Sequence, residues 1–209
     1  MQDPMRLDRA AATGGEPHKS GMDLRAAPRV GVLIRPAKLV TPDRQFLCVI
    51  RDLSETGLSV RVFHELPDRD EYCIELQNGD RIMAQVMWQD EDRLGLRFAE
   101  RADLDRLVSS PSRFAKRAIR IELDCEASLG FLGRELPARI SDISGQGAKV
   151  ICDEHLMLAS NVTLKAAGLP ETRAKVRWRR NGAYGLVFED TLQMSELAQT
   201  VAAMQQASA

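Results

Sequence analysis

The chain has 209 residues, of which 44% are apolar and 28% charged, and it carries 29 basic against 30 acidic side chains. This composition excludes wholesale disorder, and the length suits two domains of roughly 80–100 residues each. A net charge of −1 disfavours a protein that mainly binds nucleic acid, and no run of residues has the roughly 20 apolar positions that a membrane span requires.

The first 24 residues follow no regular pattern. They combine mixed charges with four glycines and prolines between positions 14 and 21, which predicts a flexible N-terminal arm over residues 1–24. They also lack the basic, apolar and small-residue order of a secretion signal. We therefore expect a cytoplasmic protein.

The next part of the chain consists of short β-rich runs. Several alternate apolar and polar residues, as half-buried strands do, and turn residues separate them. The runs occupy residues 46–50, 58–63, 72–76, 82–88 and 94–98. Their spacing predicts a small barrel or sandwich over residues 25–100.

A second copy of this domain follows at an offset of 90 residues. The motif Asp-x-Ser-x-x-Gly at residues 52–57 coincides with the same motif at residues 142–147. The later motifs Val-x-Trp and Gly-Leu-x-Phe also coincide, and no gap is needed from Ile50 and Ile140 to the end of either copy. We therefore assign the second domain to residues 113–190.

Two segments outside the copies have helical spacing. Residues 101–112 place apolar side chains at helical intervals and then stop at Ser-Ser-Pro, which predicts a short helical linker. Residues 191–209 carry Leu197, Val201 and Met204 at i, i+4 and i+7, which predicts an amphipathic helix. This helix either packs on its own barrel or binds a partner, such as a second copy of the chain.

No catalytic or metal-binding motif stands out. The sequence has no Gly-x-Ser-x-Gly, no His-Glu-x-x-His and no phosphate-binding loop, and its three histidines are scattered. Its four cysteines lie in apolar stretches, where a thiol behaves as a small buried residue. We expect no enzyme, no cofactor and no metal. The stretch around Trp178 resembles a basic patch, but its repetition at Trp88 favours a core position, with the neighbouring arginines facing solvent.

A basic cluster precedes each Asp-x-Ser-x-x-Gly motif. In the first copy Arg29 stands 23 residues before Asp52, and in the second copy Arg120 stands 22 residues before Asp142. The pairing of Arg-x-x-x-Arg with Asp-x-Ser-x-x-Gly resembles the PilZ domain, a family of bacterial receptors for cyclic di-GMP. The resemblance implies a mainly β fold: two six-stranded antiparallel barrels, each followed by a short helix, with the basic motif in a loop before the first strand.

The resemblance also implies a set of ligand-binding residues. In the first copy the motif is complete, and it comprises Arg25, Arg29, Asp52, Ser54 and Gly57. In the second copy the matching residues and their basic neighbours are Lys116, Arg117, Arg120, Asp142, Ser144 and Gly147. Lysine replaces the first arginine there and lacks the planar fork of a guanidinium, so the second copy departs from the family pattern at this position.

These residue types suit a dianionic guanine nucleotide. An arginine can hold a phosphate, pair with the O6/N7 edge of guanine or stack on the base, and an aspartate can accept hydrogen bonds from guanine N1–H and N2–H. The serine adds a polar contact or braces its turn, and the glycine lets backbone approach closely or adopt a positive φ.

Two functions follow from this reasoning. In the first, the chain binds cyclic di-GMP and passes the signal to a protein partner, with outputs such as motility, biofilm or surface polysaccharide. In the second, the copies are adaptors that act through protein–protein contacts without nucleotide. A further, structural interpretation remains for the motif itself, because Asp-x-Ser is also common in turns at the ends of strands.

Overall fold

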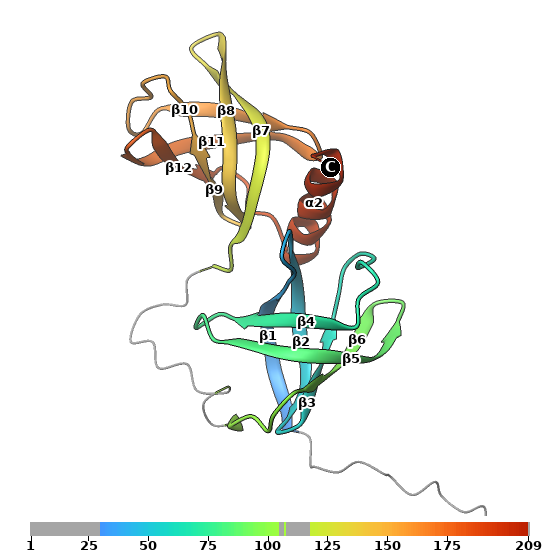
Figure 1. Cartoon of the computed structure of the whole chain (residues 1–209). Coiled ribbons are helices and arrows are strands. Elements are labelled where there is room, and N and C mark those ends of the chain that lie inside the picture. Colours follow the sequence, from blue (N-terminus) through green and yellow to red (C-terminus); the bar gives the residue numbers. More distant parts are fainter. Residues whose placement is uncertain (1–29, 105–106, 108–117, 209) are drawn as a thin grey trace, which may run out of the picture.

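The computed structural model describes residues 30–104, 107 and 118–208 (Figure 1). The predicted arm over residues 1–24 lies outside the described residues, as do Arg25, Arg29, Lys116 and Arg117. No helix in the described ranges is long and apolar enough to cross a bilayer.

Both predicted barrels are present, and each is closed by six antiparallel strands. The first has the strand order β1-β2-β3-β6-β5-β4 and the second the order β10-β11-β12-β9-β8-β7. The first comprises β1 (Val30–Val40), β2 (Gln45–Ser54), β3 (Gly57–Arg61), β4 (Glu71–Leu76), β5 (Arg81–Asp90) and β6 (Arg93–Phe98). The second comprises β7 (Ile121–Phe131), β8 (Arg134–Ser144), β9 (Gly147–Ile151), β10 (Asn161–Ala166), β11 (Leu169–Arg180) and β12 (Ala183–Phe188). The prediction of two six-stranded barrels is confirmed.

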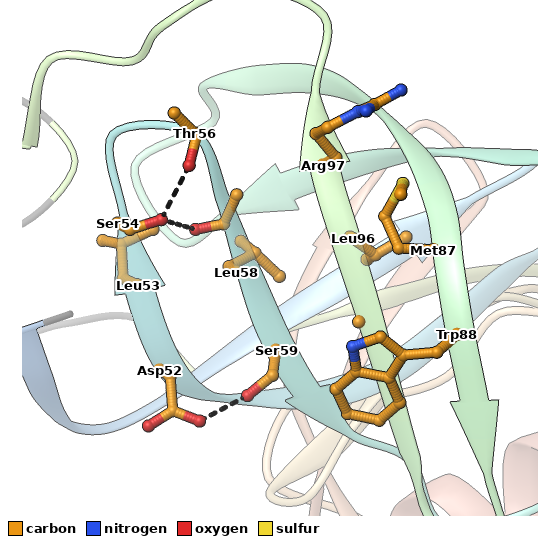
Figure 2. A pocket seen from close by; sticks show the side chains of 12 residues that line it. Asp52, Leu53, Ser54, Thr56, Leu58, Ser59, Met87, Trp88, Leu96 and Arg97 are labelled. Atoms are coloured by element: carbon orange, nitrogen blue, oxygen red, sulfur yellow. Dashed lines mark hydrogen bonds between the residues drawn. The ribbon is translucent and has the colours of Figure 1, made fainter. Parts of the chain in front are cut away.

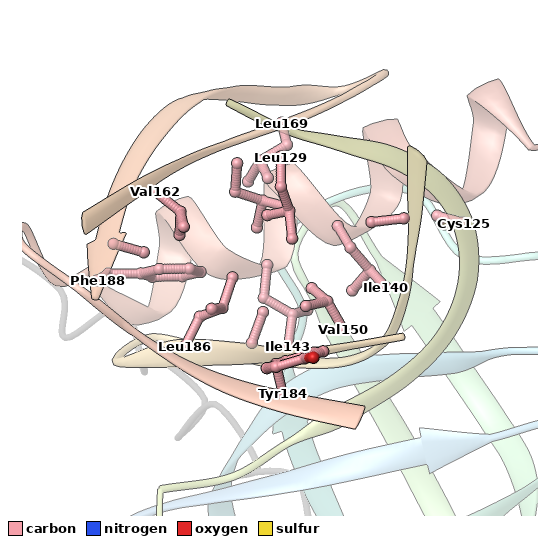
Figure 3. Close-up of a cluster of buried hydrophobic side chains, with 14 of the residues drawn as sticks. Cys125, Leu129, Ile140, Ile143, Val150, Val162, Leu169, Tyr184, Leu186 and Phe188 are labelled. Carbon is pink, nitrogen blue, oxygen red and sulfur yellow. The ribbon is translucent and has the colours of Figure 1, made fainter. Parts of the chain in front are cut away.

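Each barrel encloses its own apolar core. Alternate side chains point inward, as the period of two along a strand requires. Val60, Ile74 and Leu94 are fully buried in the first core, and Ile140 and Leu164 are fully buried in the second. Figure 3 shows Ile140 among other buried side chains of the second core.

The cysteines follow the prediction of buried thiols with one exception. Cys48, Cys125 and Cys152 are buried, and burial raises the pKa of the Cys48 thiol, so this thiol stays protonated. Cys73 is half-buried, because its neighbours Tyr72 and Ile74 take the inward positions of β4.

The C-terminal helix α2 (Met194–Ala207) packs against the second barrel. Its apolar stripe of Leu197, Val201 and Met204 is buried in the second core, which is the first of the two alternatives for this helix. At its start, the Gln193 N–H donates to the Glu196 carboxylate at 2.7 Å.

After the first barrel, the Leu107 N–H bonds to the Asp103 carbonyl at 3.1 Å, which is one helical turn. The helical linker as a whole stays a prediction.

The two barrels contact each other through β2 of the first barrel. The Gln45 side chain donates to the Glu122 carboxylate at 3.1 Å and accepts from the Glu122 N–H at 3.1 Å. The Gln205 amide of α2 donates to the Gln45 carbonyl at 3.0 Å, and Leu47 is buried among residues of the second core. Helix α2 therefore contacts both barrels.

Candidate functional site

The carboxylate of Asp52 lies on the outer face of the first barrel. A register shift between Ile50 and Asp52 interrupts the pairing of β2 with β3 at this point. Oδ2 accepts a hydrogen bond from the Ser59 hydroxyl at 2.6 Å and lies 3.7 Å from the Arg93 guanidinium. Within the described ranges Oδ1 has no hydrogen-bond partner, and the side chain is 34% exposed. Asp52 is thus held in place by Ser59, and no described residue hydrogen-bonds to its Oδ1.

Ser54 and Gly57 shape the turn beside Asp52. The Ser54 hydroxyl donates to the Gly57 carbonyl at 3.0 Å, and the residue is buried. A Cβ on Gly57 would lie 2.2 Å from the Leu96 carbonyl oxygen of β6. Ser54 therefore braces the turn. Gly57 is required because two strands approach closely, and not because of a positive φ.

Trp88 lies on the outside of the barrel, so the expectation of a core tryptophan is wrong. Ala84 and Val86 point inward, and strict alternation would place Trp88 inward as well. A register shift between Val86 and Trp88 reverses this, and the ring covers Gly95, where a Cβ would lie 2.2 Å from the indole. Trp88 is 42% exposed. It presents an aromatic surface near Asp52.

These side chains line one open pocket on β2, β3, β5 and β6 (Figure 2). Its volume is about 220 Å³, below the roughly 300–1,000 Å³ typical of small-molecule sites. Three of the predicted ligand residues, Asp52, Ser54 and Gly57, lie in its wall. Sequence reasoning missed Ser59 and Arg97, whose outward positions follow from strand alternation once the strands are known.

The corresponding face of the second barrel is arranged differently. The Arg120 guanidinium donates to Asp142 at 2.5 Å, and the Asp142 side chain is only 16% exposed. Lys149 stands where the first barrel has Ser59, and Ala183 stands where it has Arg93. The predicted pair Arg120 and Asp142 is therefore brought together, but as an ion pair that covers the carboxylate.

The turn and the tryptophan of the second copy match those of the first. The Ser144 hydroxyl donates to the Gly147 carbonyl at 3.1 Å, and a Cβ on Gly147 would lie 2.0 Å from the Leu186 carbonyl oxygen. Trp178 is 38% exposed and covers Gly185, so it is also outside the core, while its neighbouring arginines face solvent as expected.

The barrel order, the paired motif and the outer pocket occur together in this chain. The PilZ domain matches residues 23–110 and again residues 112–206. The chain belongs to the PilZ family. No curated protein matches it. Among the described residues, no group of three or more His, Cys, Asp and Glu side chains could hold a metal ion.

Several solved structures align with most of this chain at low sequence identity. PlzA of Borreliella burgdorferi, solved with cyclic di-GMP, is 16% identical, with 82% of this chain and 87% of that chain covered and a TM-score of 0.34. The motility inhibitor MotI/DgrA of Bacillus subtilis is 14% identical, with 84% and 96% covered and a TM-score of 0.37. YcgR of Escherichia coli, also solved with cyclic di-GMP, is 13% identical, with 83% and 82% covered and a TM-score of 0.29.

Proposed function

We propose that this PilZ protein is a non-enzymatic receptor for cyclic di-GMP that passes the signal to a protein partner. The observation that carries the proposal is the outer face of the first barrel, where the partly exposed carboxylate of Asp52 lies in one pocket with the exposed ring of Trp88. The ligand-bearing structures of PlzA and YcgR motivate the choice of nucleotide.

The chemistry of this pocket suits a guanine base. The Asp52 carboxylate can accept from guanine N1–H and N2–H, which adenine does not offer together. The indole of Trp88 gives a flat surface on which a base can stack, an interaction worth about 1–3 kcal/mol per base in nucleic-acid complexes. Arg97, which donates to Gln85 at 3.0 Å, adds a cation at the rim.

The phosphates require cations, which the basic motif would supply. Gly31 pairs with Asp52 across β1 and β2, and Glu122 pairs with Asp142 across β7 and β8. In the sequence, Arg29 and Arg120 each stand two residues before these paired positions. We propose that Arg29 completes the small pocket of the first barrel, together with Arg25, the first arginine of the Arg-x-x-x-Arg motif.

The second barrel would bind nucleotide more weakly. Its Asp142 already accepts from Arg120, so a guanine would have to displace that ion pair. The motif also has Lys116 in place of its first arginine. The Arg120–Asp142 ion pair favours an adaptor role for this barrel, in which the barrel contacts a protein partner without nucleotide.

Calorimetric titration of the full chain with cyclic di-GMP tests the proposal. We expect saturable binding. Arg29→Ala should lower the affinity by about 10- to 100-fold, which corresponds to the loss of one charge-assisted hydrogen bond. The matched Arg120→Ala should change the affinity by less than about threefold. No heat and no saturation with the unmodified chain would refute the receptor function and leave the adaptor function. A larger loss in Arg120→Ala would reverse the ranking of the two barrels.

A further inference from the structure

The two barrels carry opposite charge at equivalent ends. We define the acidic end as residues 65–71 and 87–93 of the first barrel, and the basic end as residues 155–161 and 177–183 of the second, which are the same positions at the 90-residue offset. The acidic end has seven carboxylates and two arginines, a net charge of −5. The basic end has three arginines and no carboxylate, a net charge of +3.

These charges are exposed and largely unpaired. At the acidic end, every carboxylate-bearing residue is exposed, and within the described ranges Asp92 alone of the seven forms a salt bridge, with Arg61 at 2.9 Å. At the basic end Arg177, Arg179 and Arg180 are exposed and form no salt bridge with any described residue, although Arg179 contacts His155. Neither end is neutralised within the described part of the chain.

Each end also presents apolar side chains between its charges. Met87 and Trp88 are 52% and 42% exposed beside the acidic end. At the basic end, Met157, Leu158 and Trp178 are all exposed. Protein interfaces are enriched in tryptophan, methionine and arginine around an apolar centre, with charged groups at the rim. Both ends present exposed tryptophan and methionine, and the charges around them are of opposite sign.

The two ends cannot satisfy each other within one molecule. In Figure 1 the turn between β5 and β6 lies at the right of the first barrel, and the turn between β11 and β12 lies at the left of the second, so the ends face opposite sides. We propose that the acidic end of one copy binds the basic end of another. Such a head-to-tail contact leaves one end free on each side, so association continues beyond the dimer. This inference does not depend on nucleotide binding.

Sedimentation velocity of the full chain at low and high salt tests this interface. We expect the mean mass to rise with concentration at about 0.02 M salt, and the association to weaken at least tenfold at about 0.5 M, where screening is short-ranged. The acidic-end variant Asp68→Lys/Asp70→Lys/Asp90→Lys/Glu91→Lys reverses that end to +3 and should stay monomeric. A matched control, Glu100→Lys/Glu126→Lys/Glu189→Lys/Asp190→Lys, changes as many exposed carboxylates elsewhere and should still associate.

A mixing experiment separates charge pairing from loss of folding. The basic-end variant Arg177→Glu/Arg179→Glu/Arg180→Glu changes that end to −3 and should also stay monomeric alone. Mixed with the acidic-end variant, it should associate again, because one protein then has two basic ends and the other two acidic ends. A monomeric unmodified chain at low salt, association insensitive to salt, a control variant that fails to associate, or a mixture that stays monomeric would each overturn the proposal.

Discussion

Asp52 and Asp142 occupy the same position in two copies of one barrel, yet their surroundings differ. Among the described residues, Asp52 bonds to Ser59 and its side chain is 34% exposed, whereas Asp142 bonds to Arg120 and is 16% exposed. Lys149 and Ala183 replace Ser59 and Arg93, the two described partners of Asp52. A motif can therefore be identical in sequence and register while its carboxylate differs in exposure.

A second difference lies at the contact between the barrels. In the first barrel Glu75 forms salt bridges with Lys38 and Arg81, and the Lys38 and Glu75 side chains are only 10% and 14% exposed. The offset of 90 residues maps Glu75 onto Lys165, which pairs with Glu135 in an exposed salt bridge. Lys38 also donates to Gln45, the residue that contacts the second barrel. The repeat is broken where one copy packs against the other.

The largest expected effect tests what the copies share. Gly57→Ala or Gly147→Ala would place a methyl group 2.2 or 2.0 Å from a backbone carbonyl oxygen, so two strands would have to separate. We expect a loss of about 1–3 kcal/mol in the free energy of unfolding for each, measured by urea denaturation. Gly130→Ala is the matched control, because its Cβ would meet the nearest atom at 3.4 Å. Equal stability of all three variants would refute the requirement for close approach.

The second prediction tests the difference between the two aspartates. Asp52→Asn removes the charge that would accept from guanine, and we expect cyclic di-GMP affinity to fall by about 10- to 100-fold in calorimetry. Asp142→Asn should change this affinity by less than about threefold. Comparable losses in both variants would show that Arg120 releases Asp142 when nucleotide is present, and that the apparent asymmetry does not control binding.

The sequence predicted the barrels well and the site in part. The 90-residue repeat, the strand alternation and the Asp-x-Ser-x-x-Gly motif are local patterns, and they led to β2 and β3 directly. The outward position of Trp88 depends on a bulge, which changes side-chain direction without a signal in residue type. The paired motif placed Arg120 and Asp142 at one site, but only the folded chain reveals that they form an ion pair and that Gln45 contacts Glu122, 77 positions away.

The smallest expected effect concerns the salt bridges of Glu75. Partial burial alone would raise the pKa of this carboxyl, but hydrogen bonds from Lys38 and Arg81, together with their charges, hold it below the usual 4.5. The ionised form is therefore favoured by folding. Its contribution to stability is fully present above pH 4.5 and is lost as the pH falls through the lowered pKa of the folded state.

Glu75→Gln should lower the free energy of unfolding at pH 7 by about 1 kcal/mol, and the difference from the unmodified chain should shrink below pH 4.5. Glu135→Gln is the matched control in the second barrel. Hydrogen bonds from Lys165 and Ser128 also lower the pKa of Glu135, but its salt bridge is exposed, so we expect a smaller effect that high salt removes. If urea denaturation across this pH range gave equal losses for both variants, contact with the second barrel would add nothing to the Lys38–Glu75 pair.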